Sequence, residues 1–571
     1  MLRELVLTAT VIVSLTPHLP AQTTVFAGGI ENAASESYPS LPGGAIAQGS
    51  MFVIYGSEMG IPSNPADLKF PLPTSEGLLG TNIQVTSGTT TVDAIMIYTT
   101  PGQVAAILPS NTPVTPVGSP GTLTLTYQGK SSSTPINIVR SSFGSFTLNT
   151  SGGGPGIVQN FVSASEIDLN TLTSPTFPGQ TVILWGTGLG PVSGKEADMP
   201  LPGDMKDALG VQVWVGSKPA TVSYAGRSGC CAALDQVIFV VPEAIQGCYV
   251  PVVVKAGGVV SNFTSMSVAP SVGGACSDAD GIDPADLKTL QSDGSVRLGA
   301  VNFTRIGLNV TSKLGPIVGA SDTVHSIFGK YSSGQLWASL GVTQSPSVGS
   351  CTVSQFLGLN PLPTDPIKPT SLDAGSSLSI NGPAGTKAIA STSTGVYSAT
   401  LGGENLDELL TGTPAAPYLL AGSYTINGTG GSAVGSFATP FTIPSDVTWT
   451  NSADITTIDR TKDLTITWSG GSANNFVAIS GLGVVPSAGA LGPSTDSPGN
   501  VFLCIAPASA GTFTVPSIVL QALPPSSTIS VVPTSFLLVG TQTAAVKFSS
   551  TGLDHGYVTY RSLSGNNVTI K

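Results

Sequence analysis

Charged side chains are scarce in this chain. Asp, Glu, Lys and Arg make up 9% of its 571 residues, whereas about 25% is usual for soluble domains. The formal net charge is −11, and no run of Lys or Arg occurs. Because nucleic acids and anionic membranes are bound through clustered basic side chains, we expect no nucleic-acid partner and no electrostatic attachment to a membrane.

Windows with helical periodicity are also almost absent. The chain instead holds 69 Gly, 44 Pro and 41% hydrophobic residues. Turn-forming residues at this frequency, between runs rich in Val, Ile and Thr, predict many short strands. The fold class we expect is all-β, and the length indicates roughly three to five domains.

The first 21 residues have the form of an export signal. Arg3 supplies a positive start, and Leu5–Leu15 is an apolar core of suitable length. We expect cleavage after Ala21 or, as an alternative, after Ala27. The segment is too short to span a bilayer comfortably, and no later stretch is long and apolar enough to be a transmembrane helix. These features predict a secreted or cell-surface protein with no transmembrane segment after removal of the signal.

The N-terminal half contains an internal repeat. Ile46–Gly60 (IAQGSMFVIYGSEMG) matches Thr176–Gly190 (TFPGQTVILWGTGLG), and Gly102–Pro113 matches Asp235–Ile245. Since a repeat decides the architecture, each copy must be a unit with its own core. About seven short strands per copy, separated by frequent turns, predict two immunoglobulin-like (Ig-like) β-sandwiches in tandem.

Changes in the sequence pattern divide the chain into six segments. They are the signal peptide (1–21), Ig-like copy one (22–140), Ig-like copy two (141–270), a linker with a short helix (271–294), a β-rich domain (295–445) and a β-rich C-terminal domain (446–571). The linker is acidic, so a calcium loop is the alternative to a plain connection. Gly281 and Gln291 do not stand where the EF-hand order requires a glycine and a final glutamate, which favours the plain linker.

Six cysteines occur, all in the part of the chain that follows copy one. They are Cys230, Cys231, Cys248, Cys276, Cys351 and Cys504. An even number in an exported chain predicts disulfides, and six cysteines allow fifteen pairings. Because a bond between neighbours strains the backbone, we expect Cys230 or Cys231 to pair with Cys248. The ligand pairs of a zinc site are missing, so no metal is expected.

The two copies differ in length at one place. Copy two has seven more residues between Tyr224 and Gln236 than copy one has between Tyr98 and Gln103. This insertion carries the first two cysteines. A disulfide staple inside an added loop is the expected use of such cysteines.

Three motifs of copy two carry a resemblance to a known family. They are WGTGLGP (Trp185–Pro191), VWVGSKPATVSYAG (Val213–Gly226) and LDQVIFVVP (Leu234–Pro242). The chain resembles the repeated domain of secreted acidobacterial proteins of unknown function, which is similar to IPT/TIG Ig-like domains. The resemblance covers roughly Thr23–Pro270, more loosely in copy one. It implies export and an all-β fold but no activity, because such domains occur in receptors, adhesins, enzymes and DNA-binding factors.

No catalytic residue, metal or cofactor is expected. Only His18, His325 and His555 occur, and no G-x-S-x-G motif accompanies them, so a Ser-His-Asp hydrolase is not indicated. The acidic group at Glu404, Asp407 and Glu408 is expected to be a solvated face. The Gly-rich turns recur at equal places in both copies, which indicates turn geometry and not phosphate binding.

Trp214 is the residue we single out for ligand binding, with a core role as the alternative. Alternation along its strand places it opposite the two neighbouring valines, so the ring can face outward as sugar-binding rings do. Trp185 occupies the place of Tyr55 in copy one, and both rings are expected to fill the same slot of the core. The function we expect is a secreted, non-catalytic interaction or adhesion module for an unknown protein or glycan partner. The alternative is a polysaccharide-binding or polysaccharide-degrading protein with its site in 295–571.

Overall fold

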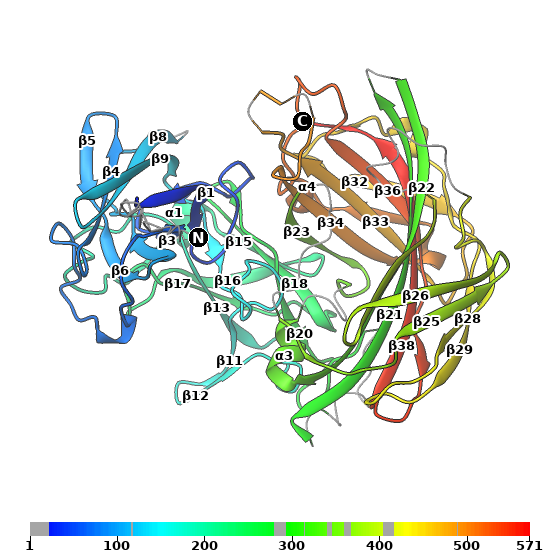
Figure 1. Ribbon diagram of the computed structural model, residues 1–571. Coiled ribbons are helices and arrows are strands. Elements are labelled where there is room, and N and C mark those ends of the chain that lie inside the picture. Colours follow the sequence, from blue (N-terminus) through cyan, green and yellow to red (C-terminus); the bar gives the residue numbers. More distant parts are fainter. Residues whose placement is uncertain are drawn as a thin grey trace, which may run out of the picture.

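The computed structural model describes residues 22–115, 118–278, 290, 293–312, 315–339, 345–358, 367–403, 416–487, 489–490 and 492–571, without the side chains of 311, 312 and 315–317. The predicted signal peptide, most of the linker helix and the acidic group at Glu404, Asp407 and Glu408 lie outside these residues. The regular secondary structure of the described residues is almost entirely strand, gathered in an N-terminal and a C-terminal lobe (Figure 1). The predicted all-β fold class is confirmed.

Copy one is a sandwich of two sheets with the strand orders β1-β3-β7-β6 and β2-β9-β8-β4-β5. Its elements are β1 (Thr24–Asn32), β2 (Ile46–Ala47), β3 (Met51–Ser57), η1 (Pro65–Asp67), β4 (Thr81–Ser87), β5 (Thr90–Asp93), β6 (Ile95–Thr99), β7 (Gln103–Ile107), β8 (Ser119–Tyr127) and β9 (Lys130–Val139). Alternate residues of facing strands fill the interior, among them Ile54, Val85, Val104 and Leu123. Two apolar inner faces with period two are what a sandwich requires.

Copy two repeats this plan. Its elements are β10 (Gly144–Ser145), β11 (Val158–Ser163), β12 (Glu166–Leu169), β13 (Thr181–Thr187), β14 (Gly203–Asp204), α1 (Lys206–Leu209), β15 (Gln212–Val215), β16 (Lys218–Arg227), β17 (Asp235–Val240), β18 (Gly247–Ala256), β19 (Val259–Val260) and β20 (Thr264–Val268). One face runs β12-β11-β13-β17-β16, and β16 then continues into the facing strands β15 and β18. The core contains Val182, Val213, Phe239 and Val252.

The register of the strands shows that the two copies are the same unit. β3 pairs with β7 as β13 pairs with β17, so that Tyr55 and Trp185 each lie opposite a glutamine. The next strand of each sheet, β6 or β16, shifts register immediately before Tyr98 or Tyr224. Since bulges are placed by specific local geometry, the shared bulge supports the predicted tandem of Ig-like sandwiches.

Two glycines of the predicted Gly-rich turns, Gly56 and Gly186, lie within strands β3 and β13 and serve the packing of strands, which the sequence did not predict. A side chain at Gly56 would collide with the main-chain oxygen of Thr24, and one at Gly186 with that of Gly144. Only glycine permits a neighbouring strand to approach so closely.

The insertion of copy two lies against the outer face of copy one. Ala232 and Ala233 pack with Ile107 and other apolar side chains of copy one. Beside them, the Glu196 carboxylate accepts hydrogen bonds from the main-chain nitrogen and the hydroxyl of Ser110, at 2.6 and 3.0 Å. The insertion therefore joins the two copies by apolar packing, and its cysteines form no staple.

The C-terminal lobe contains the remaining described elements. They are β21 (Ser295–Ser312), β22 (Gly315–Ser332), α3 (Ser333–Ala338), β23 (Ser350–Leu357), β24 (Thr370–Ser371), β25 (Ser377–Gly382), β26 (Gly385–Ser393), β27 (Val396–Gly403), β28 (Gly422–Gly428), β29 (Phe437–Ile443), β30 (Thr448–Trp449), η3 (Ser452–Asp454), β31 (Thr457–Ile458), β32 (Leu464–Ser469), β33 (Phe476–Val484), β34 (Pro498–Pro507), η4 (Ala508–Ala510), β35 (Thr512–Val515), α4 (Ser517–Leu520), β36 (Ser535–Gln542), β37 (Val546–Phe548), β38 (His555–Asn567) and β39 (Thr569–Ile570).

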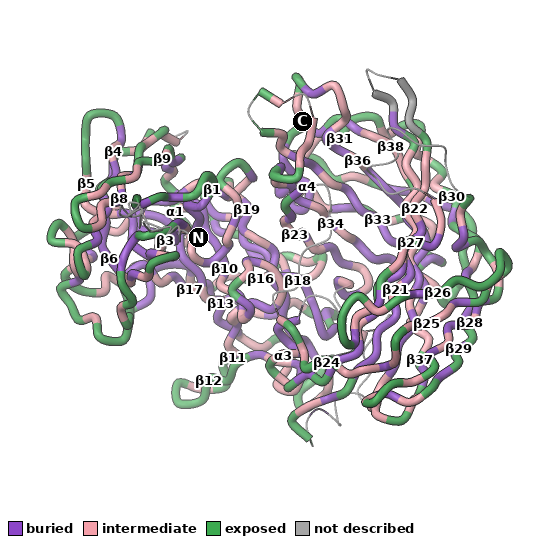
Figure 2. Tube along the Cα trace, in the orientation of Figure 1, coloured by how far each residue is buried: buried purple, intermediate pink, exposed green. Residues whose placement is uncertain are grey.

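A single sheet runs through this lobe in the order β23-β34-β33-β36-β38-β21-β22-β27-β26-β25-β28-β29. Strand β38 pairs in parallel with β21, although the two are far apart in the sequence. Two separate hydrophobic cores lie against this sheet. Figure 2 shows buried segments inside both the N-terminal and the C-terminal lobe. The sheet thus crosses the boundary predicted at residue 445, and the division of this lobe into two domains stays a prediction.

Two disulfides are present among the described residues. Cys248 pairs with Cys276, and Cys351 pairs with Cys504. The expected bond from Cys230 or Cys231 to Cys248 is wrong, and both of these cysteines are free and exposed. The reason is the direction of β17, which starts beside the insertion and leads away from it before the chain reaches Cys248.

Candidate functional site

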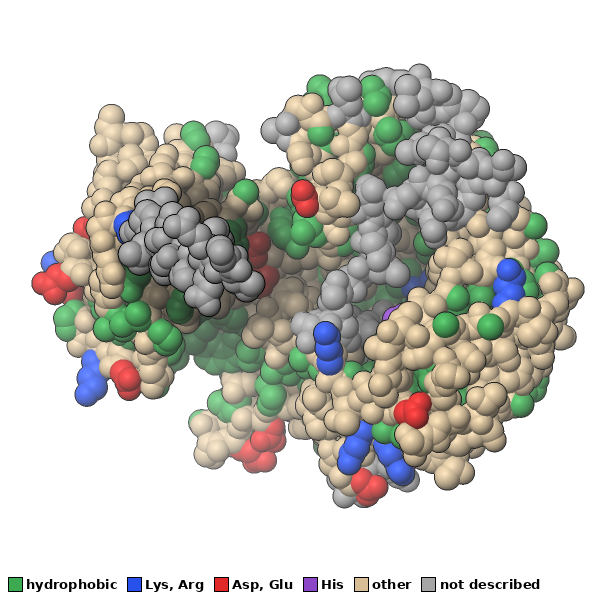
Figure 3. All heavy atoms as spheres, in the orientation of Figure 1, with side chains coloured by type: hydrophobic (Ala, Val, Ile, Leu, Met, Phe, Trp, Pro, Cys, Tyr) green, Lys and Arg blue, Asp and Glu red, His purple; other side chains and the backbone are tan. Residues whose placement is uncertain are grey.

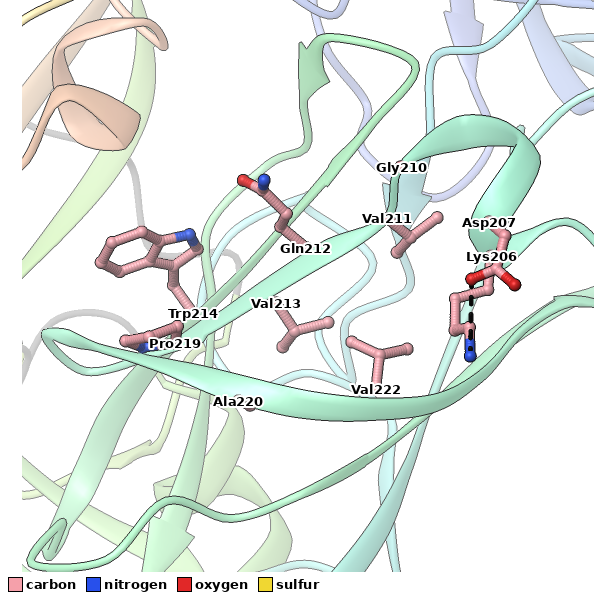
Figure 4. A pocket seen from close by; sticks show the side chains of 10 residues that line it. All are labelled: Lys206, Asp207, Gly210, Val211, Gln212, Val213, Trp214, Pro219, Ala220 and Val222. Atoms are coloured by element: carbon pink, nitrogen blue, oxygen red, sulfur yellow. Dashed lines mark ion pairs between the residues drawn. The ribbon is translucent and has the colours of Figure 1, made fainter.

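The visible surface carries few charged side chains, as the composition requires (Figure 3). A groove of about 510 Å³ lies along β15, the start of β16 and α1. Trp214, Gln212 and Pro219 line one end of it, and the ion pair between Lys206 and Asp207 marks the other (Figure 4). Ligand sites in proteins are commonly concave, mostly apolar and provided with a few polar groups.

Trp214 faces away from the core of its own sandwich, as the alternation predicted. Its neighbours Val213 and Val215 are in that core. The ring packs against the hydrophobic core that copy two shares with the C-terminal lobe, so Trp214 is half-buried. Its Nε1 is buried and has no hydrogen-bond partner among the described residues. Because an unpaired buried donor is costly, an acceptor supplied by a ligand would be stabilising there, and the role of Trp214 in ligand binding stays a prediction.

Trp185 and Tyr55 occupy the same slot in the two copies, but this slot is outside the core. Both rings are half-buried, and Leu184, the neighbour of Trp185, fills the interior instead. The indole Nε1 of Trp185 donates to Oε1 of Gln159 at 2.7 Å, and the Tyr55 hydroxyl donates to a carboxylate oxygen of Glu36 at 2.7 Å. The expectation that they fill the core is wrong, because strand alternation turns them to the outer face.

This outer face is covered in copy one and open in copy two. Ile107 and Ile95 of copy one are 0% and 3% exposed beneath the insertion. By pairing register, Val240 of copy two is equivalent to Ile107 and is half-buried. Thr221 is equivalent to Ile95 and is exposed. Among the described residues, no hydrophobic cluster covers this second face. It carries the half-buried Trp185 and Ile238 on neighbouring strands, whereas Ile183 on the same face is buried.

A pair of glutamates on copy one was not found from the sequence. Burial raises the pKa of Glu31 to about 8, and the adjacent Glu36 adds to the rise. Burial also raises the pKa of Glu36, against the effect of the hydrogen bond from Tyr55. A shared proton then links the two carboxyl groups near neutral pH. Nε2 of Gln355, in the C-terminal lobe, donates to the main-chain oxygen of Glu36 at 2.6 Å, so this pair lies where the lobes meet.

The two described histidines lie on opposite sides of β21. His325 on β22 pairs with Asn302 of β21 and with Ser398 of β27, whereas His555 begins β38. His325 is exposed, and among the described residues no hydrogen bond joins it to Ser398 or Asn302. This row of Asn302, His325 and Ser398 lacks the carboxylate of a Ser-His-Asp triad.

The described residues contain no group of three or more His, Cys, Asp or Glu side chains arranged to hold a metal ion. Their helices are all too short or too polar to cross a membrane.

Comparison with known proteins places the chain in no known family. No protein family matches it, and neither does any curated protein sequence. Similar solved structures include the titin Ig tandem A164–A165 (8% identity, 40% of this chain and 91% of that chain, TM-score 0.11). Others are three N-terminal domains of the bacteriophage RB49 outer capsid protein Hoc (9%, 69% and 96%, TM-score 0.12) and Sidekick-1 immunoglobulin domains 1–4 (10%, 95% and 100%, TM-score 0.11). Such low scores carry no argument, so the Ig-like assignment rests on the strand order described above.

Proposed function

We propose that this chain is a secreted, non-catalytic interaction module and that the outer face of copy two meets its partner. The supporting observation is the contrast between two equivalent faces. Ile107 is fully covered in copy one, whereas Val240 in copy two stays partly accessible. Clustered apolar side chains on an open sheet face are typical of protein-binding surfaces.

Relationship to the IPT/TIG-like repeated domains of secreted acidobacterial proteins is part of this proposal. It draws support from the shared turn and strand motifs of the two copies and from their common register. Export draws support from the two disulfides, which are typical of oxidising compartments.

We propose that the signal ends at Ala21. Thr23 is buried and its hydroxyl donates to the main-chain oxygen of Glu58 at 2.9 Å, and Thr24 and Val25 pair with β3. Cleavage after Ala27 would remove these contacts. Mass spectrometry of the secreted protein distinguishes the two mature N-termini.

To test the binding role, a photo-crosslinking amino acid replaces Val240. The protein is then exposed to the culture medium of its native host. The matched control is Thr91, an exposed position on the far sheet of copy one. We expect one discrete protein adduct at Val240 and none at Thr91. The captured protein, once purified, should bind the wild type and lose at least tenfold in affinity for Val240→Lys. No adduct, or equal adducts at both positions, contradicts the proposal.

Glycan binding at the Trp214 groove is the second candidate, because the Trp214 Nε1 donor has no partner among the described residues. A glycan array with the wild type, Trp214→Phe and Trp185→Phe tests it. We expect loss of a selective signal in Trp214→Phe alone, since phenylalanine keeps the apolar contact and removes the donor. Hydrolysis assays on the same glycans test the degrading activity considered for 295–571.

A further inference from the structure

The hairpin β11–β12 of copy two exposes an unusual amount of apolar surface. Phe161, Val162, Ile167 and Leu169 are 38%, 53%, 40% and 40% exposed. Figure 2 shows the hairpin as an exposed projection from the N-terminal lobe. Its base is fixed, because Nε1 of Trp337 in α3 donates to the main-chain oxygen of Asn170 at 3.2 Å. The strand is therefore held in place while its side chains stay accessible.

β12 is the last strand of its sheet, so its outer main-chain groups have no strand partner among the described residues. All four of its residues are exposed. Their order is Glu-Ile-Asp-Leu, which places Glu166 and Asp168 on one face and Ile167 and Leu169 on the other. Edge strands of this kind accept an additional strand from another chain.

The charge of the hairpin indicates which side chains the additional strand from another chain would carry. No Lys or Arg occurs in Val158–Leu169, and Figure 3 shows acidic side chains gathered at the hairpin. In an antiparallel pair, residues directly opposite each other lie on the same face and interact. Basic side chains on the incoming strand would therefore meet Glu166 and Asp168, and apolar side chains would meet Ile167 and Leu169.

A second copy of this chain fits the edge poorly. Antiparallel pairing of β12 with itself in the register that keeps the faces matched puts Glu166 opposite Asp168, which brings like charges together. A shift by one residue puts the acidic face of one strand against the apolar face of the other. Both arrangements are unfavourable.

We propose that β12 binds an extended segment of a partner protein in which apolar and basic residues alternate, by adding it as a further strand to the sheet of copy two. This inference rests on the proposed interaction function and specifies the partner's chemistry. The main chain of the segment supplies hydrogen bonds, and the alternation sets its register.

Synthetic peptides titrated into the full chain test this. The probes are an eight-residue peptide of alternating Lys and Val, its Glu/Val counterpart, a Lys/Val peptide of scrambled order, and the alternating peptide N-methylated along one edge. Fluorescence anisotropy should show binding of the alternating Lys/Val peptide at least tenfold tighter than that of the others. Equal binding of the scrambled or N-methylated peptide would mean charge attraction without strand addition and would overturn the proposal.

The variant Glu166→Lys/Asp168→Lys should reverse the preference, so that the Glu/Val peptide binds more tightly. The matched control, Asp198→Lys/Glu243→Lys, changes two exposed carboxylates elsewhere on copy two and should leave the preference unaltered. Circular dichroism confirms that each variant is folded. Self-association that the reversal abolishes would identify a second copy as the occupant and contradict the proposal. If a partner captured at Val240 binds the reversal variant as tightly as wild type, strand addition at β12 fails while the interaction function stands.

Discussion

The two Ig-like copies share their strand register and their bulge, yet they differ in what covers them. In copy one the outer face lies beneath the insertion of copy two, and Ile107 is fully buried there. In copy two the same face is open at Val240. In copy one, Glu31 lies opposite Val53 of β3. In copy two, Gln159 lies opposite Ile183, the equivalent residue of β13, so Gln159 takes the place of Glu31. The duplicated unit has kept its interior and has changed at the surfaces where neighbours attach.

The largest expected effect concerns a buried ion pair that only copy two has. Nη1 of Arg227 lies 3.0 Å from Oδ1 of Asp235, and both side chains are buried at the ends of the insertion. The equivalent residues of copy one are Pro101 and Gly102, from the common register. Arg227→Met leaves a buried carboxylate without its partner, so we expect a loss of about 3–5 kcal/mol in the free energy of unfolding. Denaturant titration followed by fluorescence measures it.

Lys206→Met is the control for that experiment, because its partner Asp207 is almost fully exposed. Exposed ion pairs contribute little to stability, so no measurable change is expected. If Arg227→Met lowers the free energy of unfolding no more than Lys206→Met does, the buried ion pair does not hold the insertion in place. It then does not explain the contrast between the copies.

A second prediction compares the two outer faces directly. Ile107→Ala removes a fully buried side chain and should cost about 2–5 kcal/mol. Val240→Ala at the equivalent position removes a smaller, half-buried side chain and should cost less than about 1 kcal/mol. Thermal and denaturant unfolding of both variants provides the comparison. Equal losses would mean that the face of copy two is covered after all.

Local patterns in the sequence predicted much of the fold and little of the site. The repeat follows from matched positions, and the side of its strand that Trp214 takes follows from the period of two; both are local properties. The cysteine pairing does not follow, because it depends on where β17 carries the chain. The core role expected for Trp185 failed for a related reason, since the equivalence of two positions does not say which side of the strand they face.

The sequence patterns did not predict the contacts between distant parts of the chain. Nothing in the sequence signals that β38 pairs with β21, because parallel pairing leaves no turn between the strands to mark it. The Glu31–Glu36 pair was missed in the same way. Its altered acidity arises from burial beside Tyr55 and beneath the contact with Gln355, and burial is a property of the assembled fold.

The last prediction concerns a dependence of stability on pH that arises at Glu31 of copy one. In the unfolded chain Glu31 titrates near 4.5, and in the folded protein its pKa is about 8. Between these values the folded state keeps a proton that the unfolded state has lost, so stability must fall as the pH rises. The decline is at most about 1.4 kcal/mol for each pH unit. Other buried acids titrate as well, so the informative quantity is the difference between wild type and Glu31→Gln, measured by denaturant titration from pH 4.5 to 8.

Glu31→Gln gives copy one the residue type that copy two has at Gln159 and should flatten the decline. The reverse change, Gln159→Glu, should introduce a weaker decline, because Gln159 is less buried and has no carboxylate in the place of Glu36. Glu36, Tyr38, Tyr55 and Tyr98 are the titratable groups around this site, and the tyrosines stay protonated across the window because their pKa values are raised above 10. If the decline persists unchanged in Glu31→Gln, the shared proton is not on this pair, and the difference between the copies at this position has no consequence for stability.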